Sequence, residues 1–269
     1  MSLATTAGPL APRDQRDLLA AYEALENPSL AARLAALAGL PVEALRARLP
    51  AALQGSVDGA VRAALTLAMS AALRSGPAVT PLPVPSGWFH RGLAFASGAM
   101  GGAFGLPGTL MELPVSTTIL LRQIAAVAAE EGEDLGAPEA AAECLKVFAL
   151  GGSSPADDAA ESGYFAVRLA LAEALKGAVG RTVLPGFVAA VASRFVGPVG
   201  LKVTAQAAPV LGAAAGAAVN LAFLQHFRSV GRGHFVLRRL ERAYGPARIR
   251  AAWAEVEAGR DAPFLPRGR

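Results

Sequence analysis

The sequence predicts an all-α protein: a multi-helix bundle with two Gly/Ala-rich central helical segments. Of the 269 residues, 53% are hydrophobic but only 6% are aromatic, and no stretch shows the sustained alternation typical of a β-strand. Apolar residues instead recur three to four positions apart, between breaks made by Gly and Pro. Because much of the apolar fraction is Ala and Gly, which carry little transfer free energy each, the composition favours close-packed helices.

Composition excludes several protein classes. The one Cys can form neither an intrachain disulfide nor a four-thiolate zinc site. The apolar content is too high for a disordered chain, while a mean hydropathy of +0.40 keeps both a membrane-associated and a deeply buried helical protein open. Residues 1–18 contain no basic segment followed by an apolar core, so we expect a cytoplasmic protein, associated with a membrane peripherally if at all.

The N-terminal part is expected to be a disordered segment, residues 1–12, followed by a helical arm, residues 13–74. A Pro-rich linker, residues 75–87, separates this arm from the rest of the chain. The arm contains four predicted helices: residues 14–26, a helix that Asn27 and Pro28 begin and Gly39 ends, a short helix that Pro41 begins, and residues 50–74.

The main body is predicted to be helical over residues 88–258, with a flexible tail at 259–269. Its amphipathic helices are expected at 112–131, at 138–150 before Gly151 and Gly152, from Ser154 to about Lys176, and from about Pro209 to a stop near Gly245. Cys144 falls on the apolar side of its helix, which predicts an inert core thiol.

Two uncharged runs, residues 92–111 and 203–227, are long enough to be considered as membrane spans. Glycine dilutes the first run, and Asn220 and His226 are among the polar residues that would need partners in the second. Small residues four apart permit close helix crossing in lipid or in a protein core. For the first run we expect a buried helical hairpin; a true span and an interfacial segment are the alternatives.

Positive charge is concentrated on the last long helix. Residues 228–250 include seven arginines against one acid, Glu241. On a helical wheel four of them fall within about 80° of one another. This basic face is either a solvated surface or a site for anionic head groups or phosphates. Aromatic residues are not interleaved with the arginines, so we expect no nucleic-acid partner. The four arginines are Arg228, Arg232, Arg239 and Arg242.

His226 and His234 both fall on the apolar side of that helix. Each is either a buried, hydrogen-bonded histidine or a base that faces a cavity. Glu112 lies between two apolar segments and either caps a helix or is a partly buried acid with a raised pKa. Three further acids could hold a hard cation, but acids in the first turns of a helix are already explained by its dipole; they are Asp157, Asp158 and Glu161.

Four ordered blocks resemble the EcsC protein family, over roughly residues 85–255. They are GGAFGLPGTLMELPVSTTILLRQIAAVAAEEGEDL (101–135), CLKVFALGG (144–152), DDAAESGYFAVR (157–168) and QAAPVLGAAAGAAVNLAFLQHFRSVGRGHFVLRRLERAYG (206–245). The resemblance implies a bacterial helical protein, cytoplasmic or membrane-associated, of a family named for its occurrence beside an ABC transporter. It carries no catalytic assignment. It does place Glu112, Tyr164, Asn220, His226, Gly231 and His234 in the motif blocks.

The leading functional hypothesis is a non-enzymatic helical protein that binds a hydrophobic, lipid-like ligand or an anionic membrane surface, in association with an ABC transporter. Glycines let a backbone approach an acyl chain, and arginines suit a phosphate or carboxylate head group. The residues expected to make these contacts are Gly212, Gly216, Asn220, Arg228, Arg232, Arg239 and Arg242.

Two alternatives stay open. A hydrolase-type enzyme would need Glu112 with His226 or His234 to converge with Tyr164 in one pocket. A self-associating scaffold would form a homo-oligomer through the glycine-spaced faces. No nucleotide-binding, zinc-binding or serine-nucleophile motif occurs in the sequence, so we expect neither a cofactor nor a metal.

Overall fold

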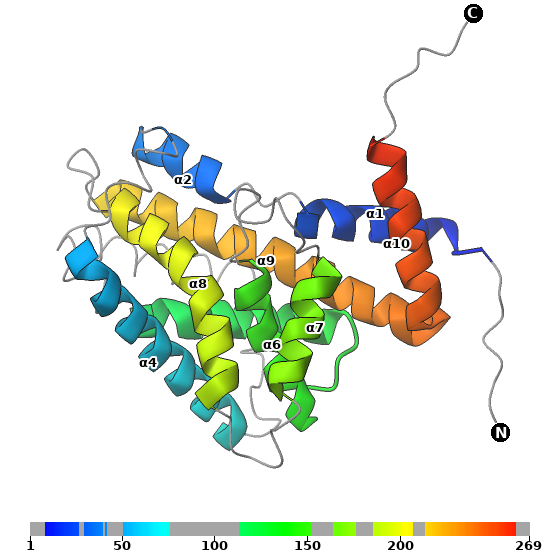
Figure 1. Cartoon of the computed structure of the whole chain (residues 1–269), viewed down its shortest axis with the longest axis horizontal. Coiled ribbons are helices and arrows are strands. Elements are labelled where there is room, and N and C mark those ends of the chain that lie inside the picture. The colour runs from blue at the N-terminus through cyan, green and yellow to red at the C-terminus, as the bar shows by residue number, and fades with distance from the viewer. Residues whose placement is uncertain are drawn as a thin grey trace, which may run out of the picture.

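In the computed structural model, one long helix, α9, runs along the other helices of the chain (Figure 1). The structure describes residues 9–26, 30–39, 41, 51–75, 113–151, 164–175, 185–206 and 213–261. These described residues form helices joined by turns, with no strand among them, which confirms the predicted all-α bundle. The helices are α1 (Pro12–Glu26), α2 (Leu30–Ala38), α4 (Ala51–Ser75), a helix over 113–130, α6 (Pro138–Leu150), α7 (Tyr164–Leu175), α8 (Pro185–Gln206), α9 (Ala213–Tyr244) and α10 (Pro246–Asp261).

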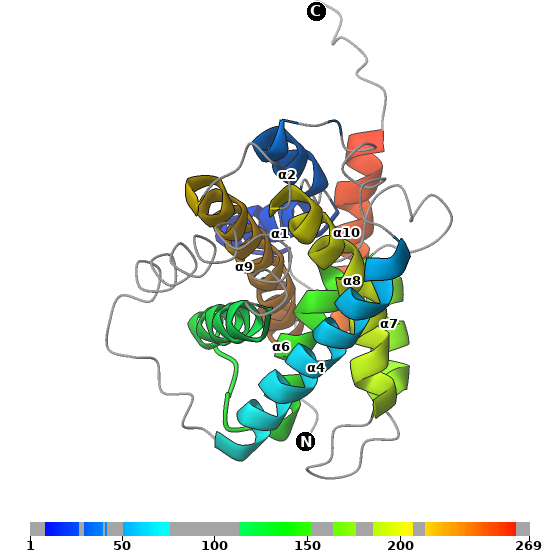
Figure 2. The same cartoon turned by 90° about the vertical axis from the view of Figure 1, so that its left-hand side faces the viewer.

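Helix α9 contacts α1, α2, α6, α8 and α10. Helices α1 and α10 lie near its C-terminal end, whereas α4 and α8 lie side by side towards its N-terminal end (Figures 1 and 2). The helices of the predicted arm therefore pack directly on α8 and α9 of the predicted body. The boundary between arm and body remains a prediction, because residues 76–87 lie outside the described residues.

A cluster of aromatic rings forms the centre of the core. Four phenylalanines from three helices have ring centroids 4.8 to 6.0 Å apart, and each is at most 3% exposed. Burial of one such side chain contributes about 1.5–3 kcal/mol, so the cluster holds α6, α8 and α9 together. Its members are Phe148 of α6, Phe195 of α8, and Phe223 and Phe227 of α9.

Most predicted helices are present with small shifts at their ends, and α6 occupies the predicted range, 138–150. Helix α9 ends before Gly245, whose φ of 87° favours glycine, and Pro246 then begins α10. The structure adds α8 and α10 to the predicted helices. The Gly197-Pro198 pair reads as a break in the sequence, yet both residues lie inside α8 because tertiary packing can offset the cost of an internal proline.

The two uncharged runs have different outcomes. Residues 92–111 lie outside the described residues. The run 203–227 is divided between the end of α8 and the first half of α9, with 207–212 not described. Among the described helices, one stretch, Gly186–Ala205, is long and apolar enough to cross a membrane by length and composition, and 56% of its apolar window is buried.

Candidate functional site

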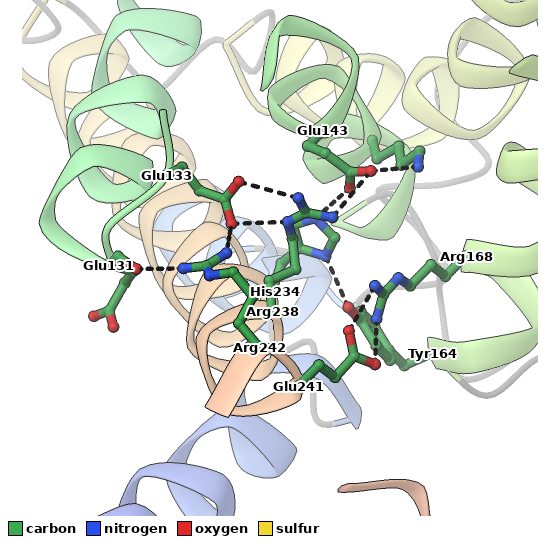
Figure 3. A network of polar contacts seen from close by, with 10 residues as sticks. Glu131, Glu133, Glu143, Tyr164, Arg168, His234, Arg238, Glu241 and Arg242 are labelled. Atoms are coloured by element: carbon green, nitrogen blue, oxygen red, sulfur yellow. Dashed lines mark hydrogen bonds and ion pairs between the residues drawn. The ribbon is translucent and has the colours of Figure 1, made fainter. Parts of the chain in front are cut away.

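A chain of hydrogen bonds links three helices inside the bundle (Figure 3). The hydroxyl of Tyr164, on α7, lies 2.8 Å from Nδ1 of His234, on α9. Nε2 of the same ring lies 3.0 Å from Oε2 of Glu143, on α6. His234 is fully buried, and Tyr164 and Glu143 are 4% and 9% exposed. The structure therefore brings together two of the predicted catalytic candidates, with a glutamate that was not predicted.

The protonation states of this chain follow from its surroundings. Burial lowers the pKa of His234, and the bond to Glu143 only partly offsets this. Burial opposes the charge of Glu143, but His234, Lys146 and Arg238 together hold its pKa well below the usual range. Burial also raises the pKa of Tyr164. Neutral His234 thus donates from Nε2–H to an ionised Glu143 and accepts the Tyr164 O–H at Nδ1.

Glu143 also joins the chain to a set of ion pairs. Lys146 Nζ donates to its Oε1 at 2.7 Å, and Nη1 of Arg238 lies 3.2 Å from the same oxygen. Arg238 in turn makes two bonds to Glu133, at 2.9 and 3.0 Å. Arg242 also binds Glu133, and its Nη2 donates to the carbonyl oxygen of Glu131 at 2.8 Å.

A glycine turn places these two acids opposite α9. The helix over 113–130 ends at Gly132, which has a φ of 77°. The amide of Glu133 donates to Ala128 O, and that of Gly132 to Ala129 O, the paired bonds typical of a Schellman ending. The turn therefore sets Glu131 and Glu133 beside the arginines of α9.

Aromatic side chains pack around the tyrosine end of the chain. The ring of Trp253, on α10, lies 4.9 Å from that of Tyr22, on α1, and 5.7 Å from that of Tyr164. Arg168 makes two bonds, at 2.8 and 2.7 Å, to Glu241 beside the same tyrosine. All three polar groups of the chain thus have partners in the protein interior. The arrangement holds helices together and presents no polar atom of this chain to a substrate.

The second predicted histidine lies elsewhere. His226 is 6% exposed, and its Nε2 lies 2.9 Å from the carbonyl oxygen of Gly151. Burial lowers its pKa to about 4, although the Gly151 bond acts in the opposite direction. Of the two readings offered by the sequence, the geometry of both histidines is that of buried, hydrogen-bonded side chains.

The four predicted arginines form the arginine face of α9: Arg228, Arg232, Arg239 and Arg242. Two of them bind acids closely. Arg239 lies 3.0, 2.6 and 3.0 Å from Asp14, Asp17 and Glu131, respectively, and Arg242 binds Glu133. The side chain of Arg232 is 61% exposed and lies 3.8 Å from Glu131. Arg228 has no ion-pair partner in the part of the chain that the structure describes.

The remaining predicted residues are either buried or outside the described residues. Asn220 is 4% exposed and has a partner in the structure, and Gly216 is also buried. Cys144 is buried, which raises the pKa of its thiol to about 12, as an inert core thiol requires. The residues that fall outside the described ones are Glu112, Asp157, Asp158, Glu161 and Gly212.

Two buried polar groups were missed in the sequence. Glu143 lies four and seven positions before Val147 and Leu150, so its place on a buried helix face could have been found from the wheel. Lys202, on α8, is 1% exposed and donates to Oγ of Ser116 at 3.3 Å. Its own helix carried no prediction, so its burial had no signal. Over the described residues, no group of three His, Cys, Asp or Glu side chains is arranged to hold a metal.

Comparison with known proteins gives one match. The model of the EcsC protein family matches residues 85–240, more than half of the chain. This range includes α6, α7, α8 and most of α9, and with them the Tyr164–His234–Glu143 chain. No curated protein and no solved structure matches the sequence.

Proposed function

The chain belongs to the EcsC protein family, and from the geometry of α9 we propose that it is a non-enzymatic helical protein that binds anionic membrane surfaces through its arginine face. The observation that carries the proposal is an exposed strip of α9 that holds Arg228 and Arg232. Two guanidinium groups one turn apart attract phosphate head groups, at about 1 kcal/mol for each.

Two neighbouring helices define this strip. A Cβ added at Gly231 would lie 3.8 Å from Ile124, in the helix over 113–130. A Cβ added at Gly233 would lie 3.1 Å from the carbonyl oxygen of Ala21, in α1. Arg232 lies between these two glycines and remains 61% exposed. The close contacts of α9 therefore leave its middle turns open to solvent between α1 and the helix over 113–130.

Helix α2 adds a second exposed basic and apolar pair beside α9. Arg33 is exposed, and Leu37, one turn later, is 37% exposed. Helix α2 packs on both α8 and α9. A face that combines a guanidinium group with an apolar side chain suits the boundary between head groups and acyl chains.

The interior chain supports the non-enzymatic part of the proposal. Tyr164, His234 and Glu143 are buried, and their polar atoms bind one another. A general base needs to reach a proton of its substrate within hydrogen-bond distance, and His234 already uses both ring nitrogens. The hydrolase alternative also needs Glu112, which lies outside the described residues.

Three finer expectations remain proposals beside this one. A hydrophobic ligand would be held within the helical body, a transporter would meet the protein at the membrane, and a homo-oligomer would form through glycine-spaced faces. Lipid that co-purifies with the protein, identified by mass spectrometry, would favour the first. A mass that rises with concentration in light scattering would favour the third.

Vesicle flotation tests the membrane proposal. The wild-type protein is mixed with vesicles of phosphatidylcholine alone, or of phosphatidylcholine with phosphatidylglycerol, at low and high salt. We expect the protein to float with the anionic vesicles at low salt only, because salt screens exposed charges beyond about 10 Å at 0.1 M. Equal binding to both vesicles, or no binding to either, would contradict the proposal.

A further inference from the structure

Helix α1 lies antiparallel along α9 and covers one end of the arginine face. Asp14 and Asp17, near its start, bind Arg239. Ala21, near its end, lies against Gly233, further back along α9. The acidic turn of α1 thus lies at Arg239, while Arg232 stays exposed beside the later turns of α1.

Arg239 is the centre of this contact. Its Nη1 donates to Asp14 at 3.0 Å, its Nη2 to Asp17 at 2.6 Å, and its Nε to Glu131 at 3.0 Å. Asp14 also accepts a bond of 2.7 Å from the Tyr244 hydroxyl. A guanidinium group that binds two carboxylates in this way has the donor arrangement that also suits a phosphate.

The polar part of the α1 contact is open to solvent. The side chains of Arg239 and Asp17 are 30% and 32% exposed. The buried residues of α1 are Leu18, Ala21 and Tyr22. Ion pairs at such exposed positions contribute little to stability and weaken with salt. The carboxylates of α1 can therefore be exchanged for other anions at a small free-energy cost.

We propose that α1 is an autoinhibitory strap on the arginine face: Asp14 and Asp17 occupy Arg239 in the free protein, and lipid phosphates replace them when the protein docks on an anionic membrane. The inference rests on the proposed function and adds its regulation. In the free protein, only the Arg228–Arg232 half of the face is available to make the first contact. Displacement of the two carboxylates then adds Arg239 to the bound surface.

The test compares two double variants with equal net charge. D14N/D17N removes the acids that face Arg239. D58N/E257Q removes two acids from exposed positions on α4 and α10, including the partner of Arg62. We expect D14N/D17N to reach half-binding at about fivefold less phosphatidylglycerol vesicle than D58N/E257Q, the factor that corresponds to one further Arg at about 1 kcal/mol. Addition of R239Q to D14N/D17N should remove this gain.

The outcomes separate the strap from the membrane function. If wild type floats with anionic vesicles but D14N/D17N binds no more tightly than D58N/E257Q, the strap is wrong and the membrane function stands. If no variant binds, both are wrong. A gain of equal size on phosphatidylcholine alone would show exposure of apolar surface and would also overturn the strap.

A second measurement uses the wild-type protein and does not depend on the folding of any variant. Hydrogen exchange is followed over α1, residues 12–26, with and without phosphatidylglycerol vesicles. Displacement of the strap predicts faster exchange of these amides when the vesicles are present. Unchanged or slower exchange in α1 on vesicles that bind the protein would overturn the inference.

Discussion

The hydroxyl of Tyr164 lies 2.8 Å from Nδ1 of His234, seventy residues further along the chain, and joins α7 to α9 inside the bundle. On the other side of the imidazole, Glu143 joins the same ring to α6. Because Glu143 is ionised and His234 neutral, each hydrogen bond has one donor and one acceptor in a fixed order. The chain is therefore a specific contact among three helices, and its energetic role can be measured.

Removal of the Tyr164 hydroxyl should destabilise the fold. Y164F leaves Nδ1 of a fully buried histidine without its donor, and a buried polar atom left unpaired costs about 1–3 kcal/mol. Urea unfolding followed by circular dichroism should show a free energy of unfolding lower by that amount.

Y244F is the matched control for the same atom. The Tyr244 hydroxyl also binds a charged partner, Asp14, but at a partly buried position that water can reach. We expect a smaller loss, below about 1 kcal/mol, because water replaces the missing partner. Equal losses in the two variants would contradict a special role for the buried chain.

Stability should fall as the pH is lowered through the range of the two buried histidines. Burial lowers the pKa of His226 from 6.5 to about 4 and also lowers that of His234. Between pH 6.5 and 4 the unfolded chain therefore binds more protons than the folded chain, so acidification favours unfolding. His226 alone contributes a slope of about 1.4 kcal/mol per pH unit, measurable in urea titrations at several pH values.

The variant H226N provides the comparison for this pH effect. It keeps a donor for the Gly151 carbonyl but removes the titrating group. The slope between pH 6.5 and 4.5 should decrease by about the His226 contribution. Below pH 4.5 the carboxylates with lowered pKa values, Asp14, Glu133 and Glu143, begin to contribute in both proteins. An unchanged slope in H226N would contradict the assignment.

Gly151 should not tolerate even one methyl group. A Cβ at this position would lie 2.4 Å from Cε1 of Phe227, a fully buried ring in the aromatic core. Movement of that ring disturbs its neighbours, so we expect G151A to lose about 1–3 kcal/mol in urea unfolding. G59A is the control, since Gly59 is helical and has no atom within 4 Å of the added methyl. It should gain about 0.5–1 kcal/mol.

The helical fold could be predicted because its signals are local. Pro138 begins α6 and Gly151 follows its last residue, and the range between them was predicted without error. Helix α8 was missed because Gly197-Pro198 imitates a helix break, although both residues lie inside the helix. Local breakers decide most helix ends, but tertiary packing overrides them where a helix is covered on several sides.

The site could be predicted only in part, for a different reason. Tyr164 and His234 were identified as candidates, but their contact depends on how α7 packs beside α9, which helical periodicity does not specify. The wheel grouped the four arginines correctly on one face. It could not show that Asp14 and Asp17, more than two hundred residues earlier, bind Arg239. Long-range ion pairs carry no local signal in a single sequence.

Flotation of R228Q/R232Q with phosphatidylglycerol vesicles tests the central claim most directly, because it removes the open half of the arginine face. R13Q/R62Q, which removes two arginines at exposed positions on α1 and α4, is the control of equal charge. At low salt, R228Q/R232Q should need at least about tenfold more lipid for half-binding than R13Q/R62Q. Equal loss in the two variants would show that net charge, and not the arginine face of α9, determines binding, and would contradict the account.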